Sequence, residues 1–340
     1  MRRLLVGLID AQVEGVQVVP DEFSIEGVGF AGEDVEYACS DWRPLRHWLL
    51  KRTTSHLSQL SLDIIHALDG SIHQPASKIA QKLHLPLVVS LWSKDEVDAF
   101  RLRKIATQVI TTVPTEPLAK YARQHLPTGV SVELVRPGVW GTDPENKPLA
   151  DPDKSLCCLV IVENAVRDHG WRNLLTAAAK LKDRMSELML FIYGPEQDQH
   201  VVWHAAHELN LLNHICMVDW GPESIVPVVQ ADVLLLPQTA TVTRTLVLEL
   251  MASTRPVISV SSPMLDFLVP DETAFILSES TEENWINSLT KLTDFPDIMI
   301  RIGESARRFV RKHHSAYGFA ESVVGVYGKL VDPPPLPFGI

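Results

Sequence analysis

Cysteine is scarce in this sequence, which has only Cys39, Cys157, Cys158 and Cys216 among 340 residues. No two of them have the spacing of metal ligands, and the adjacent pair lies inside an apolar run, as buried thiols do. The cysteines therefore give no disulfide framework. We expect a reducing compartment, the cytoplasm.

Long apolar runs are also missing. No segment approaches the ~20 consecutive apolar residues that a membrane-spanning helix needs. The first residues, MRRLLVGLI, look superficially like the start of a signal peptide, but Asp10 ends the apolar run early. We therefore predict a first β-strand at residues 4–9 and no transmembrane segment.

Positive charge is in the minority: 31 Lys and Arg stand against 42 Asp and Glu, for a formal net charge of -11. An acidic chain is a poor non-specific binder of nucleic acid or of anionic membrane surfaces. The basic stretch at 43–52, RPLRHWLLKR, is an exception. We interpret it as a solvated helix face, with a membrane or polyanion contact as the alternative.

Ordinary hydrophobic content is present, at 46% of the residues, and 340 residues is the length of two domains. In the first half, short apolar runs alternate with helical patterns. The predicted strands are 62–67, 85–91, 108–113 and 131–135, and the predicted helices are 74–83 and 116–125. β-Branched runs without strict alternation are typical of parallel strands covered by helices on both faces.

Glycine and proline interrupt the alternation after residue 138, and it then starts again. In the second half we predict strands at 156–162, 188–193, 215–218, 233–236 and 256–260. The helices expected there are 171–182, 199–209, 224–230, 245–252, 282–292 and 297–313.

This pattern predicts an N-terminal domain at 1–140, a linker at 141–154 and a C-terminal domain at 155–313. A last helix within 314–330 is expected to pack back toward the N-terminal domain, followed by an extended or disordered Pro-rich tail at 331–340. The fold class is α/β, with two Rossmann-like, doubly wound parallel sheets. Such sheets bind ligands at the carboxyl ends of their strands, which predicts a central cleft between the domains.

Motifs in the second half carry a family resemblance. The stretch 246–259, LVLELMASTRPVIS, is similar to a helix-and-strand signature E-A-M-A-x-G-x-P-V-I. Three further segments, ADVLLLP at 231–237, FIYGPE at 191–196 and VPDETAFIL at 269–277, occur in the matching order around it. In the first half, DIIHALDG at 63–70, LPLVVS at 85–90 and VRPGV at 135–139 are similar to further parts.

The ordered set, over about residues 60–315, resembles the retaining family-4 (group 1) glycosyltransferases of GT-B fold. The resemblance implies a donor domain that binds a nucleotide sugar and an acceptor domain before it. It also implies a carboxylate pair, E-x7-E, with one Glu at the donor sugar and the other on the ribose. Glu249 matches the second Glu, whereas the first position falls on Thr241.

Other family positions are replaced as well. The Gly-Phe-Gly segment that follows the first Glu reads Val242-Thr243-Arg244 here. The Arg and Lys that grip the diphosphate align with Asn164 and His169, and Arg167 substitutes if the loop is shifted. A neutral histidine supplies at most a partial charge at pH 7. In the Gly-Pro turn, Gly194 is retained on the donor side, with Glu196 behind it.

Expulsion of a diphosphate requires cations, backbone N–H groups or a helix N-terminus to hold the developing charge. The run TATVTRT at 239–245 offers four threonine hydroxyls and one guanidinium just before a predicted helix. We therefore predict donor binding by Thr241, Thr243, Arg244 and Thr245, with helix capping and turn formation as the alternative. Glu249 is expected on the ribose, the alternative being an exposed acid near a helix N-terminus.

On the acceptor side, the resemblance places Trp92 where the family has a histidine, and His66 ends a strand. Trp92 is a candidate for stacking on a sugar or base, or else a packing residue. His66 is a candidate for the cleft, or else a histidine satisfied within the core. Asp69 and Asp95 are minor candidates beside it.

The resemblance implies transfer of a sugar from a nucleotide sugar to a glycan, lipid or small-molecule acceptor with retention. No Asp-x-Asp occurs in a suitable loop, so we expect no tightly bound metal and no other cofactor. The alternative is a catalytically silent GT-B protein that binds a nucleotide sugar or a protein partner. A sugar-nucleotide epimerase or a phosphorylase is disfavoured. A lipid-linked acceptor would entail peripheral membrane association, which the charge does not support. The oligomeric state is left open.

Overall fold

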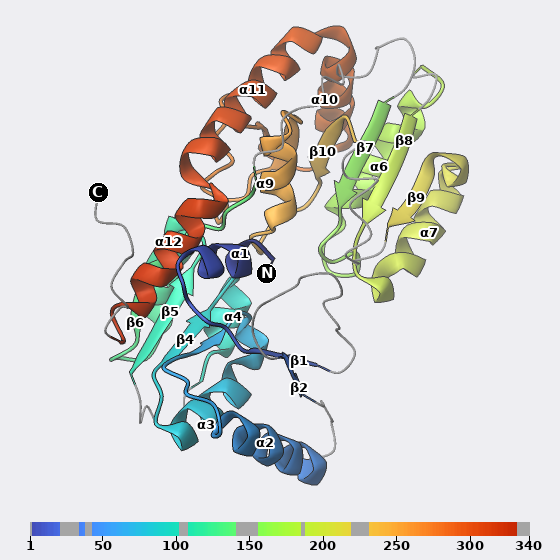
Figure 1. Cartoon of the computed structure of the whole chain (residues 1–340). Helices are drawn as coiled ribbons and strands as arrows, with labels where there is room; N and C mark the ends of the chain where they lie inside the picture. The colour runs from blue at the N-terminus through green and yellow to red at the C-terminus, as the bar shows by residue number, and fades with distance from the viewer. Residues whose placement is uncertain are drawn as a thin grey trace. The chain divides into compact units, whose positions relative to one another are not determined.

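The computed structural model describes residues 2–20, 34–37, 43–101, 108–140, 156–184, 188–218 and 231–331. The predicted linker, the helix expected at 224–230 and the Pro-rich tail from residue 332 lie outside these ranges. The chain forms two compact units (Figure 1). Unit 1 comprises residues 1–138 and 315–340, and unit 2 comprises residues 139–314.

Unit 2 is built on a six-stranded parallel sheet in the order β12-β11-β10-β7-β8-β9. Its strands are β7 (Leu156–Ile161), β8 (Leu188–Tyr193), β9 (Ile215–Val218), β10 (Val233–Leu236), β11 (Val257–Val260) and β12 (Phe275–Leu277). The chain winds outward from β7 to β9, returns to β10 beside β7, and winds outward again in the other direction. This is the strand order of a doubly wound Rossmann fold.

Helices cover both faces of that sheet. They are α6 (Gly170–Leu181), α7 (Gln199–Glu208), α9 (Thr245–Ala252), α10 (Glu282–Asp294) and α11 (Pro296–His313). Cys158 and Val160 of β7 pack into a core with α6, α7 and α10, whereas Leu159 and Ile161 pack into a second core with α9 and α11. Both sides of the strand are apolar because both are buried, which is why its sequence shows no alternation.

Unit 1 contains a four-stranded parallel sheet in the order β3-β4-β5-β6. Its strands are β3 (Ile65–Ala67), β4 (Leu87–Ser90), β5 (Val109–Val113) and β6 (Ser131–Leu134). A separate two-stranded parallel sheet pairs β1 (Gln17–Pro20) with β2 (Asp34–Tyr37), which the sequence pattern did not predict. The prediction of two parallel α/β sheets is confirmed, and the doubly wound order is seen in the unit 2 sheet, whereas the four strands of unit 1 follow one another in sequence order.

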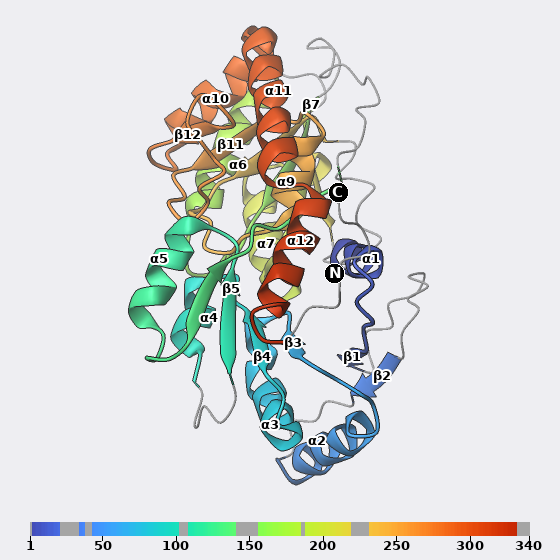
Figure 2. The ribbon, with the colours of Figure 1, turned by 60° about the vertical axis from the view of Figure 1, so that its left-hand side comes forward.

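The helices of unit 1 are α1 (Arg2–Asp10), α2 (Arg43–Leu57), α3 (His73–Leu83), α4 (Lys94–Ala99), α5 (Glu116–His125) and α12 (Ala316–Tyr327). Leu87 and Val89 of β4 pack in a core with α3, α4 and α5. Val88 packs on the other face with α1 and α12. Figure 2 shows α5 and α12 on opposite sides of β5.

The predicted first strand at 4–9 is wrong, because these residues lie in helix α1. Leu4, Leu5 and Leu8 are buried, while Val6 and Ile9 are exposed. This spacing follows the period of a helix and not that of a strand. A Cβ on Gly7 would lie 2.2 Å from the Cβ of Ala320, so the backbone of α1 packs closely against α12.

The remaining predicted elements of the described chain are confirmed, most to within a few residues. The helix at 116–125, the strand at 233–236 and the helix at 245–252 have the predicted bounds. The first half of the predicted strand 62–67 is not in the sheet, and only β3 pairs with β4. Among the helices that the structure describes, none combines the length and the apolar character needed to cross a membrane.

Candidate active site

The site of interest in unit 2 lies where the winding of the sheet reverses. β7 and β10 are hydrogen-bonded neighbours, yet their outgoing connections lead to opposite edges of the sheet. At such a point the two connections diverge and leave a crevice at the carboxyl ends of the strands, where open α/β sheets bind ligands. Glu163 follows β7 and Gln238 follows β10.

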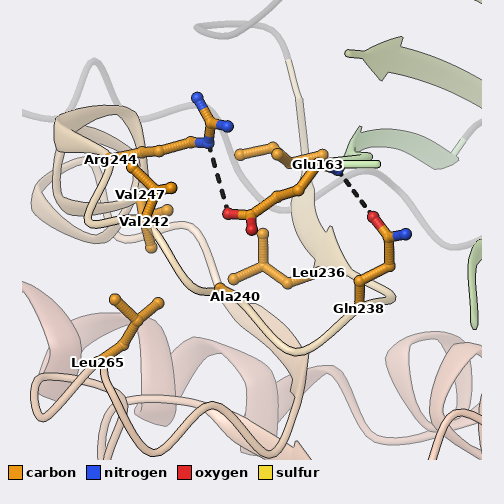
Figure 3. A pocket seen from close by; sticks show the side chains of 9 residues that line it. Glu163, Leu236, Gln238, Ala240, Val242, Arg244, Val247 and Leu265 are labelled. Atoms are coloured by element: carbon orange, nitrogen blue, oxygen red, sulfur yellow. Dashed lines mark hydrogen bonds and ion pairs between the residues drawn. The ribbon is translucent and has the colours of Figure 1, made fainter. Parts of the chain in front are cut away.

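A small pocket occupies this position, with about 260 Å³ of space that includes its open mouth. Its lining comes from the ends of both strands, the loop after β10, the start of α9 and one residue before β12: Ile161, Glu163, Leu236, Gln238, Ala240, Val242, Arg244, Val247 and Leu265. Figure 3 shows Glu163 between Arg244 on one side and Gln238 on the other.

The carboxylate of Glu163 is the most heavily engaged group in the pocket. Its Oε2 accepts hydrogen bonds from both the backbone N–H and the hydroxyl of Thr241, each at 3.1 Å. Its Oε1 lies 3.6 Å from Nε of Arg244 (Figure 3). Both side chains of this ion pair are largely shielded, at 14% exposed for Glu163 and 24% for Arg244.

The positive charge of Arg244 interacts with Glu163 and with Tyr193. Burial lowers the pKa of its guanidinium, and the negative charge of Glu163 acts against that shift. Burial also raises the pKa of the Tyr193 hydroxyl, while Arg244 lowers it and Glu249 raises it. Tyr193 ends β8, and Glu249 lies half-buried in α9. The structure therefore brings Arg244 and Glu249 to the same polar neighbourhood.

Gln238 holds the loop that carries Glu163. Its Oε1 accepts the backbone N–H of Glu163 at 2.7 Å, and its Nε2 donates to the carbonyl oxygens of Asn164 at 2.6 Å and Asp168 at 2.8 Å. The side chain is buried, at 4% exposed. A buried amide that uses both its donor and acceptor ends fixes the loop after β7 to the loop after β10.

The predicted donor residues of the loop after β7 lie close to that amide. Asn164 uses its side-chain oxygen within the loop, where it accepts N–H groups of Val166 at 3.2 Å and Arg167 at 2.7 Å. His169 is exposed at the N-cap of α6 and makes no side-chain capping hydrogen bond. Asn164 therefore holds the loop in shape, whereas His169 is exposed to solvent.

Gly194 follows β8 and is buried. A Cβ at this position would lie 3.0 Å from the carbonyl oxygen of Val162, so the turn after β8 runs close to the end of β7. Only glycine permits so close an approach without movement.

The threonines before α9 are divided in their roles. Thr241 is exposed and contacts Glu163, whereas Thr243 is buried at 6% exposed. Arg244 occupies the N-cap of α9, and Thr245 is the first residue of that helix. The N-cap residue Arg244 makes no side-chain capping hydrogen bond. The N-terminus of α9 follows directly after Arg244, so its partial positive charge lies next to the ion pair.

Sequence reasoning missed Glu163 and Gln238. Each stands just after a strand, and the two strands are those between which the sheet reverses. That position was the available signal, because residues at the carboxyl ends of switch-point strands meet in space. The resemblance drew attention instead to Asn164 and His169 in the same loop.

In unit 1, His66 is satisfied within the protein. Its Nδ1 lies 2.8 Å from the hydroxyl of Tyr327, and its Nε2 lies 2.9 Å from Oγ of Ser90, which in turn lies 2.9 Å from Oγ1 of Thr112. Burial lowers the pKa of His66 to about 3, and it raises the pKa of Tyr327. The imidazole is therefore neutral at pH 7 and links three strands with α12.

Trp92, the other predicted acceptor-side residue, follows β4. Its indole N–H donates to the carbonyl oxygen of Leu68 at 2.9 Å, and its backbone N–H donates to Oε2 of Glu96 at 2.7 Å. Ser93 caps α4 by accepting the backbone N–H of Glu96 at 3.2 Å. Burial raises the pKa of Glu96, against the lowering effect of the Trp92 hydrogen bond. Trp92 is thus part of a helix-start motif.

Among the residues that the structure describes, no group of three or more His, Cys, Asp or Glu side chains has a geometry suited to a metal ion. The charged side chains that line the unit 2 pocket are Glu163 and Arg244. The polar groups of the pocket lining are therefore this ion pair and the amide of Gln238, with the N-terminus of α9 beside them.

Comparison with known proteins gives a family match for the segment that contains this pocket. Residues 145–309 match the family described as "Glycosyl transferases group 1". This segment contains the whole pocket and all strands of the unit 2 sheet. A search of curated proteins gave no significant match.

Solved structures of similar fold cover almost the whole chain. A glycosyltransferase from Rickettsia africae superposes with a TM-score of 0.71 at 14% identity, covering 98% of this chain and 94% of that one. Sucrose-phosphate synthase from Thermosynechococcus elongatus gives a TM-score of 0.73 at 14% identity, with 97% and 92% covered.

A third similar structure is Anabaena HepE in complex with UDP and glucose, with a TM-score of 0.73 at 11% identity and 97% and 96% covered. At identities this low, the similarity to these structures shows the fold and nothing more specific. The family match, in contrast, is a similarity of sequence. Residues 145–309 of this protein are therefore similar in sequence to the group 1 glycosyl transferases, and the two parallel α/β units of the chain have the GT-B fold.

Proposed function

We propose that this protein is a glycosyltransferase that binds a nucleotide sugar in the pocket between the ends of β7 and β10. The observation that carries the proposal is the position of Arg244. It lies at the N-terminus of α9, beside the switch point of a group 1 glycosyl transferase segment. A guanidinium and a helix N-terminus together form a site for a diphosphate.

The proposal assigns a role to each predicted donor residue. Arg244, Thr241 and Thr245 serve the diphosphate, since they surround the start of α9. Glu249, one helical turn further on and electrostatically coupled to Tyr193, accepts the ribose hydroxyls. Asn164, His169, Gly194 and the buried Thr243 shape the loops around them.

The ligand class has support from proteins of the same fold. Anabaena HepE was solved with UDP and glucose, and S. aureus MnaA, with a TM-score of 0.65 at 15% identity, was solved with UDP. A uridine nucleotide is therefore the first candidate for this chain. We propose transfer to a glycan, lipid or small-molecule acceptor with retention and without a tightly held metal. The free thiols of Cys157, Cys158 and Cys216 suit the cytoplasm.

The acceptor side of the proposal rests on His66 and Trp92. Their polar atoms already have partners in unit 1, as described above. The proposal assigns the ring faces of His66 and Trp92 to contact with a sugar or base. Both residues therefore act in the proposal through packing and stacking, and not as proton donors.

Two observations favour a second function. Arg244 is already paired with a carboxylate of its own chain, and the family's diphosphate-binding Arg and Lys are replaced by Asn164 and His169. A silent GT-B protein that binds a nucleotide sugar weakly, or binds a protein partner instead, would tolerate both features.

Calorimetric titration with UDP, GDP and ADP and with their common sugar conjugates tests the donor site on which the proposed function depends. The proposed enzyme binds one nucleotide at micromolar concentration, and Glu249→Ala weakens that binding on the order of tenfold or more. Glu304→Gln, which removes an exposed acid from α11, is the matched control. Binding of none of these nucleotides would contradict the proposed donor site and favour the silent protein that binds a protein partner. Undiminished nucleotide binding by the Glu249→Ala variant would contradict the proposed contact between Glu249 and the ribose.

A further inference from the structure

The ion pair in the pocket has a consequence for ligand binding. Glu163 contributes a negative charge and Arg244 a positive charge, and the other residues that line the pocket are uncharged. The pocket is therefore electrically balanced as it stands. A diphosphate that entered it would meet a carboxylate as well as a guanidinium, and like charges in a shielded site repel strongly.

The Glu163 carboxylate faces donors of the kind that bind phosphate oxygens. It accepts the Thr241 backbone N–H and hydroxyl, and its other oxygen faces Arg244. Backbone N–H groups, hydroxyls and guanidinium groups are the usual donors to phosphate oxygens. A carboxylate and a phosphate compete for the same donors, so only one of them binds at a time.

The backbone beneath this carboxylate is fixed. Gln238 accepts the N–H of Glu163 and donates to the carbonyl of Asn164, from a buried position. The carboxylate can therefore leave Arg244 by rotation of its own side chain, while the loop keeps its place. A substitution at Glu163 that preserves the shape of the side chain leaves the pocket intact.

We propose that Glu163 is the resident anion of the Arg244 site and sets its affinity, so that a diphosphate group binds by displacing the Glu163 carboxylate from Arg244 and Thr241. This inference rests on the proposed function for the identity of the natural ligand, a nucleoside diphosphate sugar. The competition itself requires only a diphosphate. Exchange of one anion for another forms and breaks no covalent bond.

The test is calorimetric titration of the full chain with inorganic pyrophosphate. Glu163→Gln keeps the size of the side chain and removes its charge, so pyrophosphate should bind on the order of tenfold more tightly than to the unchanged protein. Glu304→Gln, the same change at an exposed position of α11, should leave the affinity unaltered. In the double variant Glu163→Gln, Arg244→Gln, the gain should disappear.

Three results would overturn the inference: no measurable pyrophosphate binding by the Glu163→Gln variant, an affinity equal to or weaker than that of the unchanged protein, or a gain that persists without Arg244. Glu163→Ala is the second variant, and it should show the same gain if Gln disturbs the fold. Thermal unfolding of each variant identifies a misfolded protein.

The same variants separate this inference from the proposed function. If Glu163→Gln gains affinity for pyrophosphate while neither protein binds UDP, GDP or ADP, the resident anion is correct and the nucleotide assignment is wrong. If a nucleotide binds the unchanged protein but Glu163→Gln brings no gain with pyrophosphate, the assignment stands and the resident anion is wrong.

Discussion

Nδ1 of His66 lies 2.8 Å from the hydroxyl of Tyr327, which joins β3 of the four-stranded sheet to α12. The two rings meet edge to face, with centroids 5.7 Å apart. The other ring nitrogen contacts Ser90 of β4. The imidazole thus ties α12, which is remote in sequence, to the sheet that it covers.

The first prediction concerns pH. Burial lowers the pKa of His66 from 6.5 to about 3, so the unfolded chain binds a proton at a pH where the folded protein does not. The stabilising contribution of the neutral imidazole is complete above pH 6.5 and is lost as the pH falls toward 3. Its loss should reach at most ~1.4 kcal/mol of unfolding free energy per pH unit in that window.

Urea denaturation at pH 7.5, 6, 5 and 4.5 measures this effect. The informative quantity is the difference in unfolding free energy between the unchanged protein and the His66→Gln variant, since other groups titrate in both. That difference should shrink as the pH falls. A difference independent of pH would mean that His66 protonates as readily in the folded protein as in the unfolded chain.

The second prediction concerns the hydroxyl of Tyr327. Tyr327→Phe removes one partner of a satisfied histidine and leaves Nδ1 of His66 without it. A polar group left unsatisfied in this way costs about 1–3 kcal/mol. Tyr317→Phe, at a side chain that is 75% exposed, is the matched control and should change the stability by less than ~0.5 kcal/mol. Equal effects of the two substitutions would contradict the role of the Tyr327 hydroxyl.

The third prediction concerns Gln238. In Gln238→Glu a carboxylate oxygen replaces the Nε2 that donates to the carbonyls of Asn164 and Asp168. Oxygen then faces oxygen in a buried place, which should destabilise the loop after β7 by about 2–4 kcal/mol at pH 7.

Hydrogen exchange of the backbone amides at 163–170 measures the loop directly, and protection should fall there first. Gln197→Glu is the control, because this exposed glutamine lies in the turn after β8. Unchanged protection in the Gln238→Glu variant would show that the loop does not depend on the amide.

The fourth prediction compares two glycines in facing helices. Gly7→Ala in α1 places a Cβ 2.2 Å from that of Ala320, and the two helices must separate, at a cost of about 1–3 kcal/mol. Gly325→Ala in α12 meets no atom within 4 Å and should stabilise the helix by up to ~1 kcal/mol. Thermal unfolding distinguishes the two signs.

The combination of Gly7→Ala with Ala320→Gly provides an internal check on this contact. Removal of the opposing methyl group should restore part of the lost stability. If the double variant is no more stable than Gly7→Ala alone, the close approach of α1 to α12 is not the cause of the loss.

The sequence by itself determined the alternating order of strands and helices and the parallel sheets. In unit 2, β10 and α9 have the bounds that the sequence predicted. The strand was recognisable because a strand that is buried on both faces must be apolar throughout. The run of threonines before α9 and the position of Glu249 were likewise readable, since local spacing relates them to the helix that carries them.

Only the tertiary structure decided the nature of residues 4–9 and the partner of Arg244. The run around Leu4 and Leu8 is short and apolar enough for a strand, and it becomes a helix because α12, from the far end of the chain, covers one side of it. Glu163 and Arg244 meet because the sheet reverses between β7 and β10. The order of the strands brings these two residues together, and no periodic pattern in the sequence encodes that order. The contact can therefore be recognised only in the folded sheet.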